Sequence, residues 1–183
     1  MRRLVIAVSG TPGAGKSAFA RALAGKLGAR SVDLNALITK EKIYSLDTDG
    51  TKAIDVKRMQ EAFKRDISAS AGPIVVEGLL AHLLPKGIVT QVVVLRTNPK
   101  ELEKRLIARG YSKKKVIENV EAEALDIILW EAVHAHGLAK VYEIDTTRSK
   151  ASTSVKLFLR AMKGEVSLRP GRIAWLENYL KTR

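Results

Sequence analysis

Short apolar segments alternate with amphipathic segments along this chain. The apolar segments predict strands over residues 4–8, 74–77, 91–96 and 140–144, and residues 30–33 can form a short second strand. Residues 4–8 are apolar throughout, which is typical of a strand buried on both faces of a parallel sheet. The alternation of strands with helices predicts a single three-layer α/β domain over residues 1–183, with a five-stranded parallel sheet at its centre.

Between these segments, apolar residues recur at the three- and four-residue spacing of helices. Asn98 and Pro99 mark one helix start as cap and first turn, and Gly110 marks its end. The pattern predicts helices over residues 17–27, 34–43, 55–71, 98–110, 112–136, 152–163 and 172–181, with a polar link at 47–50.

A glycine-rich segment lies between the first strand and the first helix. Residues 10–17 read Gly-Thr-Pro-Gly-Ala-Gly-Lys-Ser and fit the phosphate-loop pattern G-x-x-x-x-G-K-[ST] completely. Such a loop turns backbone N–H groups toward phosphate oxygens, and the helix that starts near Gly15 adds its positive dipole end. Lys16 is expected to reach the β- and γ-phosphates, and the Ser17 hydroxyl to ligate Mg²⁺. The segment predicts a site for a nucleoside triphosphate.

An acidic residue, Glu77, ends the apolar segment 74–76. An acid at this position commonly holds the Mg²⁺ shell, directly or through water, and the alternative is a strand-end carboxylate paired with a surface lysine. His82 is either a satisfied core residue or a catalyst. His134 and His136 are interpreted as structural, because no partner ligand lies at a metal-binding spacing.

Three arginines, Arg96, Arg105 and Arg109, follow the valine-rich strand. Arg105 and Arg109 are four residues apart and are expected to share one helix face. Planar guanidinium groups can stabilise the charge on a transferring phosphoryl group. The alternative is that they pair with Glu101 or Glu103 on the helix surface. The lysines at 113–115 are interpreted as a solvated face.

Basic residues outnumber acidic ones, and the excess lies at the two ends of the chain. There are 32 Lys and Arg against 19 Asp and Glu, and the formal net charge is +13. Residues 1–32 hold six basic and no acidic residues, and residues 140–183 hold ten basic and four acidic ones. The excess is either an electrostatic footprint for RNA or another polyanion, or a solvated lysine-rich surface of the kind found in thermophile proteins.

Composition excludes several other classes of protein. The chain has no cysteine, which excludes disulfide scaffolds, cysteine zinc sites and thiol nucleophiles. Its longest stretch without Asp, Glu, Lys or Arg is residues 4–15, which is too short to span a bilayer. The start of the chain is interpreted as a strand and not as a signal peptide. We expect a cytoplasmic protein that does not bind a membrane.

Taken together, these residues resemble the adenylate kinase isoenzyme 6 family, also called coilin-interacting nuclear ATPase, which includes archaeal members. The resemblance covers about residues 3–147, and residues 169–177 look like the archaeal C-terminal extension. It is carried by residues 10–17, 94–97 (Val-Leu-Arg-Thr), 105–111, 114–115 and 119–123.

The resemblance implies reversible transfer of a phosphoryl group from ATP to AMP with Mg²⁺, and also ATP hydrolysis. It implies a nucleoside-monophosphate-binding insertion at about 33–56, a lid at about 108–118 that brings Arg109 to ATP, and a C-terminal helical extension at about 151–183. Because eukaryotic members act in maturation of the small ribosomal subunit, it also implies a small-subunit ribosomal protein and pre-ribosomal RNA as partners beside ATP and AMP.

The candidate site residues fall into three groups. The nucleotide-binding group is Gly10, Gly13, Ala14, Gly15, Lys16, Ser17, Ala18 and Arg109; the catalytic group is Lys16, Arg105 and Arg109; the metal group is Ser17 and Glu77.

The chain departs from the family pattern at two places. The family often shows Asp-x-His at the metal-binding strand, where this chain reads Glu-Gly-Leu at 77–79. If that histidine assists hydrolysis, its role is either lost or taken by His82. The insertion at 33–56 holds Lys40, Lys42 and Lys52 but no arginine. Lysine lacks the bidentate fork of arginine, so weak AMP affinity is expected.

Three functions are therefore expected. The first is a small nucleoside monophosphate kinase that uses ATP and Mg²⁺. The second is an ATPase-type assembly factor of the ribosome with little AMP kinase activity. The third is a phosphate-loop kinase for another small acceptor, and residues 33–72 would then determine which acceptor binds.

Overall fold

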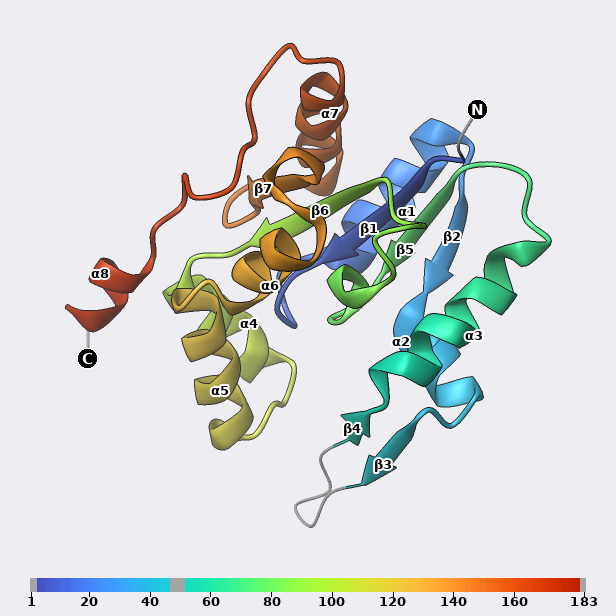
Figure 1. The fold of residues 1–183 in the computed structure, drawn as a ribbon. Helices are drawn as coiled ribbons and strands as arrows, with labels where there is room; N and C mark the ends of the chain where they lie inside the picture. Colours follow the sequence, from blue (N-terminus) through green and yellow to red (C-terminus); the bar gives the residue numbers. More distant parts are fainter. Residues whose placement is uncertain (1–2, 47–51, 182–183) are drawn as a thin grey trace.

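The computed structural model describes residues 3–46 and 52–181 and has a parallel sheet at its centre (Figure 1). Its strands are β1 (Val5–Ser9), β2 (Arg30–Asp33), β5 (Ile74–Glu77), β6 (Gln91–Arg96) and β7 (Val141–Asp145). Their order is β2-β5-β1-β6-β7, and every neighbouring pair is parallel. The predicted α/β fold with a five-stranded parallel sheet is confirmed. Because β1 is central, the loop that follows it lies where the chain winds off in two directions, the usual place for a ligand.

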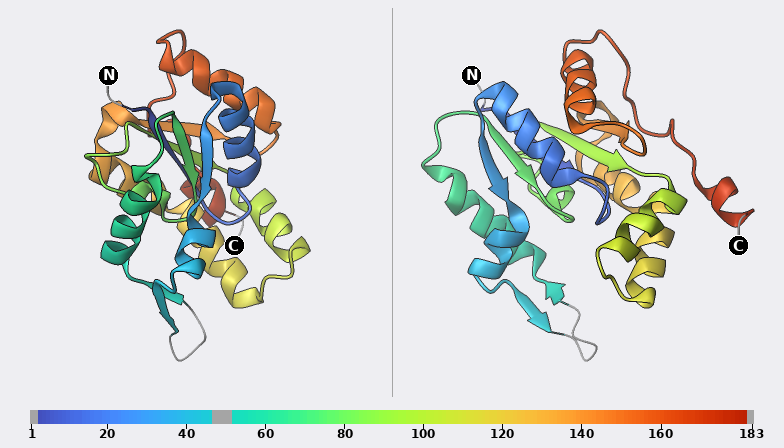
Figure 2. Two further views of the ribbon diagram at one scale, coloured as in Figure 1. Left: turned by 90° about the vertical axis from the view of Figure 1, so that its right-hand side faces the viewer. Right: turned by 180° about the vertical axis from the view of Figure 1, so that it is seen from behind.

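Helices cover both faces of the sheet (Figure 2). One face carries α1 (Lys16–Leu27) and α7 (Ala151–Met162), and the other carries α3 (Val56–Ser68) and α6 (Ile127–His136). Side chains alternate along a strand. Val5 and Ala7 therefore join the core on the α3 and α6 side, whereas Ile6 and Val8 join the core on the α1 and α7 side. This double burial explains why the first strand is apolar throughout.

Two further helices, α4 (Pro99–Ala108) and α5 (Lys113–Ala124), form a pair after the carboxyl end of β6 (Figure 1). The side chain of Asn98 accepts a hydrogen bond from the backbone N–H of Lys100 at 3.0 Å, so it caps α4 as predicted. Gly110 has a φ of 76° and lies just beyond the last turn, also as predicted.

The single long helix predicted over residues 112–136 is wrong, because the chain forms α5 and α6 there. Between them Asp126 adopts a left-handed conformation with a φ of 57°. Arg96 of β6 donates hydrogen bonds to the carbonyl oxygen of Glu123, at 3.0 Å, and to the carboxylate of Asp126. The buried guanidinium of Arg96 thus hydrogen-bonds a carbonyl oxygen that would accept from the next turn if the helix continued.

The structure differs from the predicted pattern at two other helices. Residues 34–43 hold only α2 (Leu34–Lys40), because Lys42 has a φ of 51° and the chain turns into an antiparallel hairpin. Residues 172–181 hold a shorter helix than predicted, and the polar link predicted at 47–50 lies outside the described residues. The remaining elements are β3 (Tyr44–Leu46), β4 (Lys52–Ile54), α8 (Leu176–Leu180) and the 3-10 turns η1 (Ala81–Leu83) and η2 (Leu138–Lys140).

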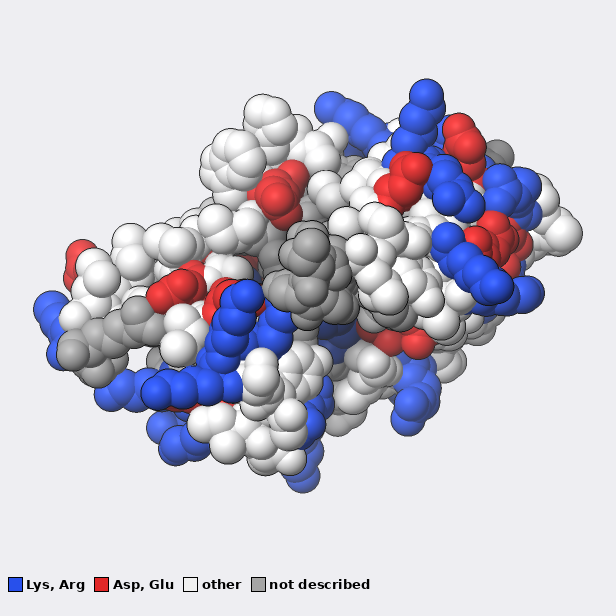
Figure 3. Space-filling model, turned by 90° about the horizontal axis from the view of Figure 1, so that it is seen from below, with Lys and Arg blue, Asp and Glu red and all other residues white. Residues whose placement is uncertain are grey.

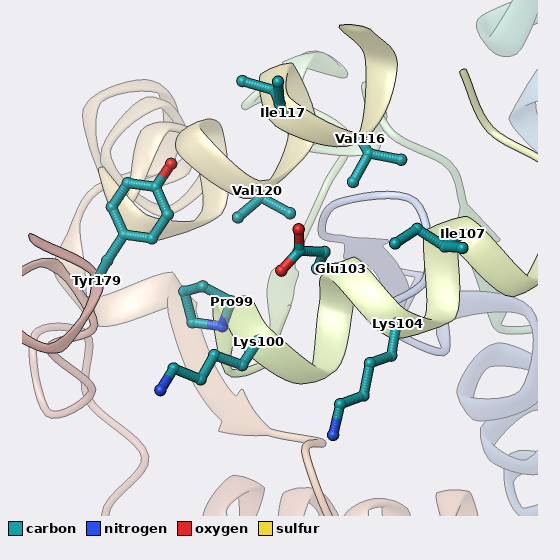
Figure 4. Close-up of a pocket in the computed structure, with 9 residues that line it drawn as sticks. All are labelled: Pro99, Lys100, Glu103, Lys104, Ile107, Val116, Ile117, Val120 and Tyr179. Carbon is teal, nitrogen blue, oxygen red and sulfur yellow. The ribbon is translucent and has the colours of Figure 1, made fainter. Parts of the chain in front are cut away.

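An apolar groove of about 420 Å³ lies between α4 and α5 (Figure 4). Val116 and Val120 belong to its apolar wall, and the Tyr179 ring of α8 packs against the same cluster. The groove contains no residue of the phosphate loop, and Tyr179 of the C-terminal helix is one of the residues that line it. Within residues 3–46 and 52–181, no helix combines the length and apolar character needed to cross a membrane.

Candidate active site

The phosphate loop joins β1 to α1 and depends on its glycines. Gly15 has a φ of 91° and is the N-cap residue of α1. Gly10 has a φ of 144°, and a Cβ atom placed there would lie 2.5 Å from the carbonyl oxygen of Leu95. Only glycine lets the loop pass this close to β6.

The ammonium group of Lys16 lies against the loop. Its Nζ donates hydrogen bonds to the carbonyl oxygens of Gly10, at 2.9 Å, and Thr11, at 3.0 Å. The pKa of Lys16 is lowered from 10.5 to about 8, chiefly by burial; the carboxylates of Glu77 and Glu123 oppose this shift, and the guanidinium of Arg109 adds to it. A phosphate ligand would supply the negative charge that favours the ammonium form.

Ser17 and Glu77 form the second polar pair of the site. The Ser17 hydroxyl donates a hydrogen bond to Glu77 Oε1 at 2.8 Å, and Glu77 is only 7% exposed. Paired oxygen donors suit Mg²⁺, which is usually held by one or two protein groups together with substrate phosphates. Among the described residues no three His, Asp or Glu side chains gather as a metal site. A metal here would therefore take most of its ligands from the nucleotide and water.

A cavity of about 520 Å³ brings most of the predicted site residues together. Of the predicted residues it is lined by Gly13, Gly15, Lys16, Ser17, Ala18, Glu77 and Arg109. Seen from below, Lys and Arg side chains are spread over much of the visible face, with Asp and Glu side chains among them (Figure 3). The cavity is thus cationic at the loop and acidic at the end of β5, which suits a phosphate ester accompanied by a metal ion.

Gly10, Ala14 and Arg105 do not line this cavity. Ala14 is buried, and its backbone N–H bonds to the carbonyl oxygen of Thr11 at 3.1 Å inside the loop. Arg105 donates to the carbonyl oxygen of Thr147 at 2.6 Å. It also pairs with Glu101 at 3.3 Å, which the sequence offered as the alternative to a contact with the phosphoryl group. A longer contact, 3.3 Å, joins Arg105 to the carbonyl oxygen of Gly13. Arg105 thus lies behind the loop, and its catalytic role stays a prediction.

His82 is a core residue with both ring nitrogens engaged. It is 1% exposed; Nδ1 lies 2.8 Å from Ser9 Oγ and Nε2 lies 2.8 Å from Glu131 Oε2. Burial lowers its pKa. His82 does not line the cavity, whereas Leu79, which stands where the family often has a histidine, does.

The other two histidines have contacts that fit a structural role. His136 Nε2 lies 2.7 Å from the carbonyl oxygen of His82, and burial lowers the pKa of His136. The ring of His134 stacks on Trp130 with 5.2 Å between centroids. Neither histidine lines the phosphate-loop cavity.

The cavity also contains polar residues that sequence analysis missed: Arg21, Asp33, Asn35 and Tyr111. Asp33 could have been found, because it ends β2 in direct register with Glu77 at the end of β5. The carboxyl ends of adjacent parallel strands meet at one edge of a sheet. Arg21 lies one helical turn after Ser17 on α1, a spacing that also places both on one face.

Known proteins resemble this chain in sequence and in fold. The chain matches the family described as AAA domain over residues 6–126. A Thermococcus onnurineus protein named "Putative adenylate kinase" is 36% identical over 178 residues, which covers 97% of this chain and 94% of that protein. One of the same name from Thermococcus kodakarensis is 38% identical over 176 residues, covering 96% and 95%. A solved shikimate kinase from Acinetobacter baumannii, in complex with shikimate, has a TM-score of 0.62 at 18% identity and covers 88% of this chain and 94% of that chain.

The fold and the site define an α/β domain with a phosphate loop, a fold that it shares with the solved shikimate kinase. The chain belongs to the AAA domain family and, over nearly its whole length, to the archaeal family that the two Thermococcus proteins represent.

The affinity for ATP is expected to fall as pH rises above 8. Without nucleotide the pKa of Lys16 is about 8, and bound phosphates favour the ammonium form and raise that pKa. Between the two pKa values, binding takes up a proton, so the dissociation constant increases roughly ten-fold per pH unit. Calorimetric titrations from pH 7 to 10 in buffers of different ionisation enthalpy would measure affinity and proton uptake. Lys16→Arg is the control, because its charge and hence its affinity should not change over this range. Equal wild-type affinity at pH 7 and pH 9.5 would contradict the prediction.

Proposed function

We propose that this protein transfers the γ-phosphoryl group of ATP to AMP and so produces two molecules of ADP. The supporting observation is one cavity that is lined by the phosphate loop together with Arg109 and with Asp33 at the end of β2. In the proposal, the acceptor would enter this cavity and lie next to the terminal phosphate of ATP. The names of the archaeal relatives, at 36–38% identity, favour a nucleotide as that second substrate.

In this proposal the protein acts by positioning and charge stabilisation, without a covalent intermediate. The loop N–H groups and Lys16 bind the ATP phosphates, and Arg109 stabilises charge on the transferring group from the α4–α5 connection. Gly10 and Ala14 maintain the shape of the loop from within. Mg²⁺, bound with ATP and held by Ser17 and Glu77, would neutralise phosphate charge.

The acceptor side is proposed to lie along residues 33–56, with the cover at 108–118. The cover comprises the end of α4, the connection with Arg109 and Tyr111, and the start of α5. Arg21 faces the same cavity as Asp33 and Asn35. Residues 33–56 contain no arginine, and the guanidinium of Arg21 would supply the two parallel N–H donors that bind an acceptor phosphate.

Nucleotide product analysis tests the proposal. With ATP and Mg²⁺, ADP is expected to form rapidly only when AMP is present, at two ADP per AMP consumed. The reaction should stop with EDTA, and Glu77→Gln should need more Mg²⁺ than the wild type for half-maximal rate. Consumption of ATP without consumption of AMP would contradict the AMP kinase assignment, and a screen of hydroxylated small molecules would then identify the acceptor.

A second candidate function, an ATPase-type ribosome assembly factor, is favoured by the charge of one face. The helices α1 and α7 pack side by side, and residues 1–32 and 146–164 contain no acidic residue. Exposed basic side chains on these helices include Arg21, Lys26, Lys156 and Arg160. Such a face attracts a polyanion, and it agrees with the resemblance to the isoenzyme 6 family and its small-subunit ribosomal partners.

The same assay separates the two candidates. An assembly factor would release ADP and phosphate at a rate independent of AMP, and ribosomal RNA or a small-subunit ribosomal protein would change that rate. If RNA neither binds nor changes the rate at low salt, the charged face is only a solvated surface and the second candidate fails.

A further inference from the structure

We propose that Glu123, in the last turn of α5, is a positioning residue that holds the phosphate loop in its ATP-binding shape through Thr11. The inference depends on ATP binding at this loop, but not on AMP being the acceptor. The pair is separated by 112 residues in the sequence, and neither residue lines the cavity.

Both carboxylate oxygens of Glu123 accept hydrogen bonds. Glu123 is 3% exposed; Oε2 accepts a hydrogen bond from the Thr11 hydroxyl at 2.8 Å, and Oε1 accepts from Arg96 Nε at 2.7 Å and from the Thr97 N–H at 3.0 Å. Thr11 itself is 1% exposed. The carboxylate therefore connects the loop to the end of β6 through fully buried, charge-assisted hydrogen bonds.

The charge cluster around Glu123 is unusual for a small core. Arg96 is 2% exposed and also pairs with Glu143 of β7 at 2.7 Å and with Asp126. Burying such groups costs desolvation energy that their attraction roughly offsets, so an apolar core would serve stability as well. The cluster instead holds the phosphate loop, β6, α5 and β7 together by directional contacts, near the point where the loop leaves β1. This favours a positioning role over a purely stabilising one.

Thr11 connects the buried cluster around Glu123 to the part of the loop that would bind phosphate. Its carbonyl oxygen accepts hydrogen bonds from Lys16 Nζ at 3.0 Å and from the Ala14 N–H at 3.1 Å. Holding the Thr11 side chain from behind therefore fixes both the turn of the loop and the position of the Lys16 ammonium. If Thr11 shifts, the loop N–H groups no longer converge on one phosphate position.

The cluster also includes the C-terminal segment. Glu143 Oε2 accepts hydrogen bonds from the N–H groups of Gly171 and Arg172, both at 3.0 Å. The helix that carries Glu123 begins at Lys113, four residues after Arg109. Through α5 and Arg96, the loop, the Arg109 connection and the C-terminal segment thus share one buried anchor.

Thr11→Val is the decisive variant, because it removes only the hydroxyl and leaves the pair of Glu123 and Arg96 intact. We expect its dissociation constant for ATP, measured by calorimetry without AMP, to rise about ten-fold, as for the loss of one charge-assisted hydrogen bond. The KM for ATP should rise with it while kcat stays close to the wild-type value. Thr11→Ser keeps the hydroxyl and should restore the affinity.

Thr90→Val is the matched control. Thr90 makes two hydrogen bonds with the backbone of Val5 at the opposite end of β1, so this substitution should lower the unfolding temperature without changing ATP affinity. Glu123→Gln leaves Arg96 undercompensated and is expected to lose both stability and affinity, which is why it does not decide the question alone.

The outcomes are separable. Wild-type ATP affinity in Thr11→Val would overturn the inference, as would a loss of affinity and unfolding temperature that Thr11→Ser does not restore. Failure of the wild type to bind ATP would instead overturn the proposed function.

Discussion

Replacing Lys16 by Met is expected to lower the rate of phosphoryl transfer by about 10²–10³-fold, the loss typical of removing one preorganised donor from a charged transition state. The methionine side chain preserves the length and the apolar contacts of the stem but cannot donate to a phosphate. Because Lys16 Nζ bonds only to loop carbonyl oxygens among the contacts described here, the fold should survive its loss. Initial rates of ADP formation at saturating ATP measure the effect, and circular dichroism checks the fold.

Lys26→Met is the control for that experiment. Lys26 is exposed in the last turn of the same helix, so its replacement removes the same charge from α1 without touching the cavity. A Lys16→Met protein that retains more than half of the wild-type rate would show that the chemistry takes place elsewhere. A rate lost equally in both variants would point to the overall charge of α1 and not to the loop.

The strands were predictable because their determinants are local. Residues 74–76 and 92–95 are apolar, form short runs and lie next to helical segments, which is the pattern of strands buried in a parallel sheet. The hairpin of β3 and β4 was not predictable in this way. It follows from the left-handed turn at Lys42, an unusual conformation for lysine that no apolar pattern reveals.

The break between α5 and α6 was not predictable from the apolar pattern either. Here the pattern predicts a continuous helix that the structure interrupts. The apolar period continues through residues 112–136, but the helix stops where Arg96 bonds the Glu123 carbonyl oxygen. Arg96 and Glu123 are 27 residues apart, and their meeting depends on the packing of α5 against the end of β6. A tertiary ion pair of this kind overrides helical propensity and leaves no periodic signal.

The phosphate loop was predictable for a different reason: its whole geometry lies within eight consecutive residues. The arginines were predicted less well. A spacing of four residues places two side chains on one face only while both are helical. Arg105 lies in the last turn of α4, but Arg109 lies past its end, with φ −90° and ψ 3°. The two guanidinium groups therefore diverge, one to the back of the loop and one into the cavity.

This divergence makes opposite predictions for the two arginines. Arg109→Ala is expected to lower kcat by about 10³-fold, as for a guanidinium that stabilises phosphoryl transfer, and Arg109→Lys should not restore it, because an ammonium group lacks the planar fork. Arg105→Ala should act mainly on the KM for ATP and on stability, since its contacts are with loop and turn carbonyl oxygens and with Glu101. Steady-state rates with ATP and AMP measure both effects. Lys104→Ala serves as the charge-matched control, because Lys104 is exposed on α4 and does not line the cavity. If Arg105→Ala abolished turnover while Arg109→Ala preserved it, the cavity described here would not be where the phosphoryl group moves.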